Sequence, residues 1–71
     1  MPETIGDRIR ALRLSEGLSQ NQFAREIYVT RKTVYRWEQG KAVPYAHDVQ
    51  HIAERFKISC DYLILGKNGT T

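Results

Sequence analysis

The segment LSQNQFAREIYVTRKTVYRWEQGK, residues 18–41, decides the fold because it contains two helix starts eleven positions apart. Ser19 and Gln22 form a capping box, in which an N-cap hydroxyl is followed three residues later by a reciprocal side chain. The helix that it starts is only about eight residues long and needs packing partners to be stable in water. Thr30 fits the N-cap of a second helix, which ends at Gly40.

The connection between these two helices is very short. Tyr28 and Val29 alone join them before the cap residue, and two short helices joined by a three-residue turn form a helix-turn-helix. Apolar residues at helical spacing would lock the two helices at a fixed angle. They are Phe23, Ala24, Ile27, Val29, Val34 and Trp37.

The rest of the chain is divided by similar signals. Three further helices are predicted, at about Thr4–Glu16, Tyr45–Phe56 and Ser59–Gly66, and no alternating pattern indicates a strand. We therefore expect an all-α fold, a compact bundle of about five short helices, as a single domain over residues 1–66. Residues 67–71 have the composition of a flexible C-terminal tail. The predicted inward-facing residues outside the first segment are Ile5, Ile9, Leu12, Val49, Ile52, Ala53, Phe56, Tyr62, Leu63 and Leu65.

Length and composition exclude several classes of protein. A chain of 71 residues and 8.2 kDa has room for one modest core and not for a deep catalytic cleft, so we expect no enzyme and no cofactor. No apolar run approaches the roughly 18 residues that a membrane span needs, and Met1–Thr4 lacks the start of a secretory signal. The expected location is cytoplasmic. The single cysteine, Cys60, excludes an intrachain disulfide and a cysteine-only zinc site.

The positive charge is concentrated in the middle of the sequence. The net charge is +3, and the segments before and after residues 19–41 each carry equal numbers of acidic and basic residues. The middle segment therefore holds the whole excess, which favours a polyanionic partner. Its charged residues are Arg25, Arg31, Lys32, Arg36 and Lys41 against Glu26 and Glu38.

The second helix of the pair carries Arg31, Lys32 and Arg36 on the side that is expected to face solvent. An α-helix fits the major groove of B-form DNA, and arginine or lysine side chains can donate to the O6 and N7 atoms of guanine. The start of the preceding helix offers Ser19, Gln20 and Asn21, whose polar groups suit phosphate oxygens. The sequence therefore predicts binding to double-stranded DNA.

The chain resembles the phage repressor and Cro-like (XRE-type) helix-turn-helix family over about residues 5–66. The resemblance rests on Ser19-Gln20 at one helix start, Trp37-Glu38-Gln39-Gly40 at the next helix end and Asp61-Tyr62-Leu63 near the close. It implies a lambda repressor-like DNA-binding fold. It also implies base contacts from Arg31, Lys32 and Arg36 with Thr30 and Tyr35 nearby, phosphate contacts from Ser19, Gln20, Asn21, Gln39 and Lys41, and an internal ion pair between Arg13 and Glu38.

Two positions depart from the family pattern. Tyr28 stands in the turn where the family usually has glycine, so either this tyrosine adopts a left-handed backbone or the turn has another shape. Tyr45 follows Pro44, where a hydroxyl cap is usual. Neither change removes a residue that faces the groove.

Three features allow other interpretations. The run from His47 to His51 superficially resembles a zinc-protease helix, but no third ligand is evident, so we expect no metal site. Cys60 is expected to behave as a small buried hydrophobic residue. Ile64 and Leu65 could add apolar surface for a two-fold interface, and dimers reading a palindrome are the usual way to gain affinity, so we expect a homodimer.

The function predicted from the sequence is that of a sequence-specific transcriptional regulator that acts by occupancy of its operator, where the bound dimer blocks polymerase, as a repressor does, or recruits it. With no effector domain, no small-molecule ligand is expected. A controller of a restriction–modification or toxin–antitoxin operon is an alternative on the same scaffold, which genomic neighbours would distinguish. Another alternative is a protein-interaction module that kept the fold but lost DNA binding; a reversal of the charge on the helix at residues 30–39 would have suggested it, and here that face is basic.

Overall fold

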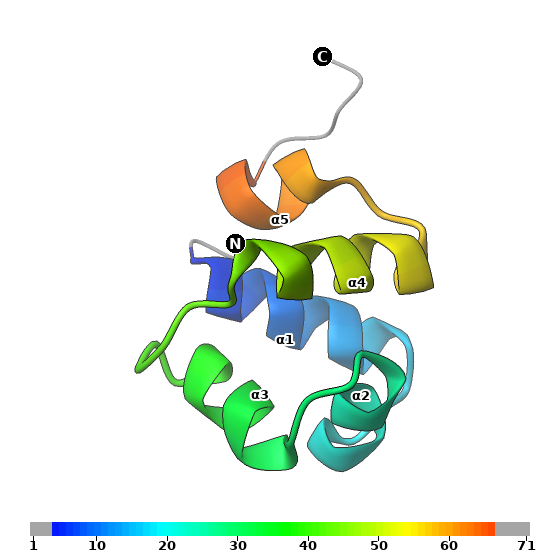
Figure 1. Cartoon of the computed structure of the whole chain (residues 1–71), viewed down its shortest axis with the longest axis vertical. Coiled ribbons are helices and arrows are strands. Elements are labelled where there is room, and N and C mark those ends of the chain that lie inside the picture. The colour runs from blue at the N-terminus through cyan, green and yellow to red at the C-terminus, as the bar shows by residue number, and fades with distance from the viewer. Residues whose placement is uncertain (1–3, 67–71) are drawn as a thin grey trace.

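The computed structural model describes residues 4–66 and has five helices over that range. Figure 1 shows α2 and α3 together at one end of the molecule and α5 at the other, with α1 and α4 between them. No strand occurs in the described range, so the predicted all-α bundle is confirmed. The predicted tail at residues 67–71 lies outside the described residues. The helices are α1 (Ile5–Ser15), α2 (Gln20–Glu26), α3 (Arg31–Glu38), α4 (Ala46–Phe56) and α5 (Cys60–Leu65).

Four of the helices begin at the hydroxyl caps expected from the sequence. In each, the cap oxygen accepts a hydrogen bond from the backbone N–H three residues ahead, which satisfies a donor that the helix itself leaves unpaired. The caps are Thr4 to Asp7 at 3.0 Å, Ser19 to Gln22 at 3.1 Å, Thr30 to Thr33 at 3.2 Å and Ser59 to Tyr62 at 3.0 Å.

The start of α4 is stabilised differently. Tyr45 has no hydroxyl at the position that a cap needs, but its backbone N–H donates to Asp48 Oδ2 at 3.0 Å. A carboxylate in the first turn also interacts favourably with the positive end of the helix dipole. The missing hydroxyl cap is thus partly replaced by the acidic residue three positions later.

The core contains the apolar stripes that the sequence predicted, with two corrections in α5. Leu65 is 61% exposed and Cys60 is also exposed, because this short helix turns only the side that carries Leu63 toward the core. The rings of Phe23 and Phe56 stack with centroids 5.1 Å apart and join α2 to α4. The buried apolar residues are Ile9, Leu12, Phe23, Ala24, Ile27, Val34, Trp37, Val49, Ile52, Phe56 and Leu63.

A close backbone approach sets the position of α3 on α1. Gly6 is buried in the first turn of α1, and a Cβ atom added to it would lie 2.0 Å from the carbonyl oxygen of Trp37. Two backbones can come this close only where a side chain is missing. The end of α3 is therefore held directly against the start of α1.

A buried arginine connects α1 to α5. The Arg8 side chain donates from Nε to the carbonyl oxygen of Leu63 at 2.8 Å and from Nη2 to that of Ile64 at 2.9 Å. These carbonyls belong to the last turn of α5, which has no partners for them within the helix. A positive charge at this end of a helix also complements its dipole. The first and last helices are thereby joined.

Tyr28 has a left-handed backbone, which decides between the two shapes that the sequence left open for the turn. Its φ angle is +66°, and its side chain is 83% exposed. A residue with a Cβ atom in this conformation costs about 1–2 kcal/mol, and exposure means that little burial offsets this cost. The turn keeps the shape that a glycine would give it.

Replacing Tyr28 with glycine is therefore expected to raise the free energy of unfolding by about 0.5–1 kcal/mol, because the strain disappears and the ring that is lost is 83% exposed, with an edge contact to His51. Urea denaturation followed by circular dichroism would measure this change. Tyr28→Ala is the matched control, since alanine removes the ring but keeps the strain and should give no gain. Equal effects of glycine and alanine would contradict the role assigned to the backbone.

Candidate nucleic-acid interface

The outer face of α3 holds the residues that were predicted to contact bases. Val34 and Trp37 are buried and fix the rotation of the helix, so the opposite side is turned to solvent. On that side the structure brings together four exposed side chains, of Arg31, Lys32, Tyr35 and Arg36. Thr30, at the start of the helix, is exposed as well.

The positive charge on this face is not neutralised within the described structure. Between residues 4 and 66, none of the basic side chains of α3 or the turn after it lies within 4.0 Å of a carboxylate. These are Arg31, Lys32, Arg36 and Lys41. Cations that are exposed and without an ion-pair partner attract a polyanion most strongly.

Two of the predicted contact residues also take part in local structure. The Thr30 hydroxyl caps α3 and lies 3.0 Å from the Thr33 hydroxyl. The Ser19 hydroxyl accepts from Gln22 N in the cap of α2, while the Gln22 side chain accepts from Ser19 N at 2.8 Å. The Ser19 oxygen thus has one partner and its hydroxyl keeps a donor for another, whereas the Thr30 oxygen already has two partners, both on Thr33.

The other residues that were predicted to contact phosphates lie at the ends of α2 and α3. Asn21, Gln39 and Lys41 are exposed, whereas Gln20 is partly buried. The chain turns sharply after α3, where the backbone N–H of Lys41 donates to the carbonyl oxygen of Arg36 at 2.9 Å. This turn keeps Lys41 beside the last turn of the helix.

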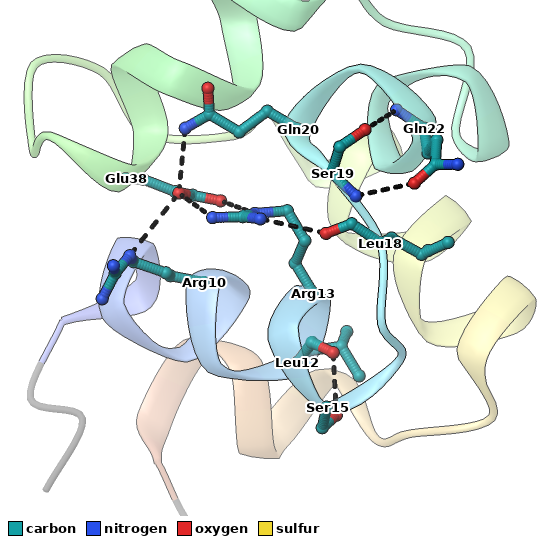
Figure 2. Close-up of polar contacts among 9 residues, drawn as sticks. All are labelled: Arg10, Leu12, Arg13, Ser15, Leu18, Ser19, Gln20, Gln22 and Glu38. Atoms are coloured by element: carbon teal, nitrogen blue, oxygen red, sulfur yellow. Dashed lines mark hydrogen bonds and ion pairs between the residues drawn. The ribbon is translucent and has the colours of Figure 1, made fainter.

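Glu38 joins α1, α2 and α3 in one polar network (Figure 2). Arg13 donates from Nε to Oε2 at 2.7 Å and from Nη2 to Oε1 at 3.1 Å, and its Nη1 donates to the carbonyl oxygen of Leu18 at 3.0 Å. Gln20 donates from Nε2 to Oε1 at 3.1 Å. The Glu38 side chain is only 2% exposed, so a buried carboxylate is held by a paired guanidinium and an amide.

Arg10 belongs to this network but was not predicted from the sequence. Its Nε lies 4.0 Å from Glu38 Oε1, and its side chain is 61% exposed. Residues three apart on a helix lie on the same side, so the spacing of Arg10 and Arg13 was the signal that could have placed both near Glu38. The Gln20 contact needed the tertiary structure.

The histidine pair lies on α4, apart from this network. The rings of His47 and His51 have centroids 6.0 Å apart. Within the described range, no three histidine, cysteine, aspartate or glutamate side chains are grouped so that they could hold a metal ion. Among the helices between residues 4 and 66, none combines the length and the apolar character that crossing a bilayer requires.

Comparisons with known sequences support the resemblance. Residues 6–69 match a family model described as "Helix-turn-helix domain". The chain is 31% identical over 63 residues to the HTH-type transcriptional activator BcrR of Enterococcus faecalis, covering 89% of this chain and 31% of that protein. It is 31% identical over 62 residues to YonR of Bacillus subtilis strain 168, an SPbeta prophage-derived uncharacterized HTH-type transcriptional regulator, covering 87% and 57%. The chain thus spans less than two thirds of each relative.

Comparisons with solved structures give the same fold. The P22 c2 repressor in a crystal structure with a synthetic operator has a TM-score of 0.85 at 25% identity, covering 92% of this chain and 98% of that one. The solution structure of the DNA-binding domain of the P22 c2 repressor has a TM-score of 0.84 at 24% identity, covering 100% and 93%. The chain therefore belongs to the phage repressor and Cro-like helix-turn-helix family, as its sequence indicated.

Proposed function

We propose that the chain is a sequence-specific transcriptional regulator, a repressor, that binds double-stranded DNA and reads the major groove with α3. The observation that carries this proposal is the outer face of α3, where Arg31, Lys32 and Arg36 are exposed and have no ion-pair partner within residues 4–66. The buried side chains of Val34 and Trp37 hold that face rigidly. The P22 c2 repressor, which has the same fold, was solved in complex with an operator.

Recognition then divides between two groups of residues. Arginine and lysine side chains on α3 donate to the O6 and N7 atoms of guanine, while Tyr35 and Thr30 contact neighbouring groups in the groove. Gln20, Gln39 and Lys41, with Ser19 and Asn21, bind phosphates and set the register of α3 on the duplex. Occupancy of the operator then excludes polymerase, with no cofactor and no catalytic step.

We further propose that two copies bind a palindromic operator. One domain of this size offers few contacts for high affinity, and a two-fold dimer doubles them across two half-sites. The exposed side chains of Ile64 and Leu65 on α5 support an additional apolar contact between copies. We place this binding to the operator in the cytoplasm.

The proposal is tested by selecting bound duplexes from a random DNA pool at about 150 mM salt, where non-specific binding is weak. An enriched palindrome is the expected result, and the spacing of its half-sites gives the geometry of the dimer. Enrichment of a single half-site would overturn the dimer but keep the DNA-binding function. No enrichment by a folded sample would favour the protein-interaction module instead. A controller or antitoxin role would give the same enrichment, because it uses the same chemistry.

Replacing Arg36 with alanine is expected to weaken binding to the selected operator by about 1–3 kcal/mol and to relax the preference at one base pair. The loss follows because a bidentate contact from this exposed side chain to one guanine would disappear. Repeating the selection with the variant measures the preference at each position. Gln20→Ala is the comparison, since a lost phosphate contact weakens binding to all sequences alike. An unchanged preference at every position in Arg36→Ala would contradict base reading by Arg36.

A further inference from the structure

The exposed guanidinium of Arg10 has no strong partner in the described structure. Its ion pair with Glu38 is the one that it forms among residues 4–66, and the separation of 4.0 Å exceeds the length of a hydrogen bond. The side chain is 61% exposed, so it is accessible to a further acceptor. A surface ion pair with this geometry contributes little to stability.

The Glu38 carboxylate has enough hydrogen-bond donors without Arg10. Its two carboxylate oxygens already accept three hydrogen bonds, two from Arg13 and one from Gln20. Two guanidinium groups therefore face one buried carboxylate, which leaves one positive charge in excess at this point of the surface. The carboxylate still attracts Arg10 and so holds its flexible side chain over the network.

Arg10 is next to residues of the proposed DNA interface. Arg10 and Gln20 approach the same oxygen atom, Glu38 Oε1, from different sides (Figure 2). The distance between their contacting nitrogens therefore cannot exceed the sum of 4.0 Å and 3.1 Å. Gln39, another residue proposed to bind phosphate, follows Glu38 directly in the chain. The fold thus brings a cation from α1 to the C-terminal end of α3.

We infer that Arg10 is a further phosphate-binding residue of the interface, and that Glu38 positions it beside Gln20. This inference rests on the proposed DNA-binding function. The guanidinium donates to phosphate oxygens of the DNA backbone, where its planar donor pair fits two oxygens. Arg13 stays on Glu38, so the buried carboxylate keeps its partner when Arg10 turns to the DNA. The contact carries no sequence information and adds to affinity for any duplex.

Fluorescence anisotropy with Arg10→Gln tests the inference. Binding is measured between about 50 and 200 mM salt on the selected operator and on a scrambled duplex of equal length. The expected slope of log K against log salt is smaller in magnitude by about 0.9 than that of the wild type, because one phosphate contact is lost. The affinity is expected to fall several-fold and by the same factor on both duplexes. Arg10→Lys keeps the charge and is expected to retain the slope.

Lys57→Gln is the matched control. It also removes one exposed positive charge, but Lys57 is the C-cap residue of α4 and is not among the residues proposed to contact DNA. The slope of this variant is expected to equal that of the wild type. The thermal unfolding midpoint of Arg10→Gln is expected to change little, because the ion pair that it loses is 4.0 Å long and its arginine side chain is 61% exposed.

Three results would overturn the inference. Equal slopes for Arg10→Gln and Lys57→Gln, with operator binding by the wild type intact, would refute the role of Arg10 and leave the proposed function standing. A weaker affinity with an unchanged slope would do the same, because no phosphate contact would have been removed. No binding of any duplex by the folded wild type would refute the proposed function and this inference together.

Discussion

Gly6→Ala is expected to destabilise the domain by about 3 kcal/mol, the upper end of what overpacking usually costs. The new methyl group would lie 2.0 Å from the carbonyl oxygen of Trp37, and a backbone atom cannot move aside as a side chain can. Helix propensity predicts the opposite sign, because alanine is favoured over glycine by about 1 kcal/mol inside a helix. A domain of this length has a total stability of only about 4–10 kcal/mol, so the loss would be a large part of it.

Urea denaturation of the wild type and the variant measures this difference. Gly17→Ala is the control at a position with open space, where an added Cβ meets no atom within 4 Å. Gly17 has a φ angle of +70°, so its replacement should cost about 1–2 kcal/mol from backbone strain alone. A Gly6→Ala protein that is more stable than the wild type would disprove the close approach of α1 and α3.

Glu38→Ala is expected to cost about 3–5 kcal/mol, because it leaves the Arg13 guanidinium buried without its counter-ion. The Arg13 side chain is only 11% exposed and donates twice to this carboxylate. Gln20 would lose its acceptor in the same change. Glu38 joins residues of α1, α2 and α3, so its loss should also loosen the packing that sets the angle between α2 and α3.

Two comparisons separate burial from charge. Glu26→Ala breaks the exposed pair with Arg55 and should cost at most about 1 kcal/mol. The double variant Arg13→Met/Glu38→Leu removes both buried charges and should recover most of the stability, since apolar residues of similar volume can replace a buried pair. Chemical denaturation of the single and double variants measures the coupling. A double variant no more stable than Glu38→Ala would show that the buried charge is not the cause.

Local features of the fold were predictable because their causes lie within a few residues of one another. The hydroxyl caps at Ser19 and Thr30 act over three residues, and the apolar stripe of α4 repeats over one helix. The short connection at Tyr28 and Val29 fixed the helix-turn-helix. The exposure of the outer face of α3 followed from the burial of its other side.

Features that depend on contacts between distant segments could not be predicted. The approach of Gly6 to Trp37 and the position of Arg10 near Glu38 join residues 31 and 28 positions apart. Two shapes of the turn at Tyr28 stayed open, because the sequence alone does not determine whether the packing of the neighbouring helices forces this residue into a left-handed backbone. The prediction for Leu65 was wrong because α5 is too short to bury a second side. The bases that α3 would read depend on an operator outside the chain.

The bonds from Arg8 to α5 also bear on the order in which the chain folds. Their acceptors lie 55 and 56 residues further along the sequence, close to the full length of the described domain. On the ribosome, α1 is made first but cannot give its guanidinium these partners until α5 has emerged. A closure of such long sequence separation is slow compared with the formation of single helices. The bonds that join α1 to α5 can therefore form only after α5 has left the ribosome.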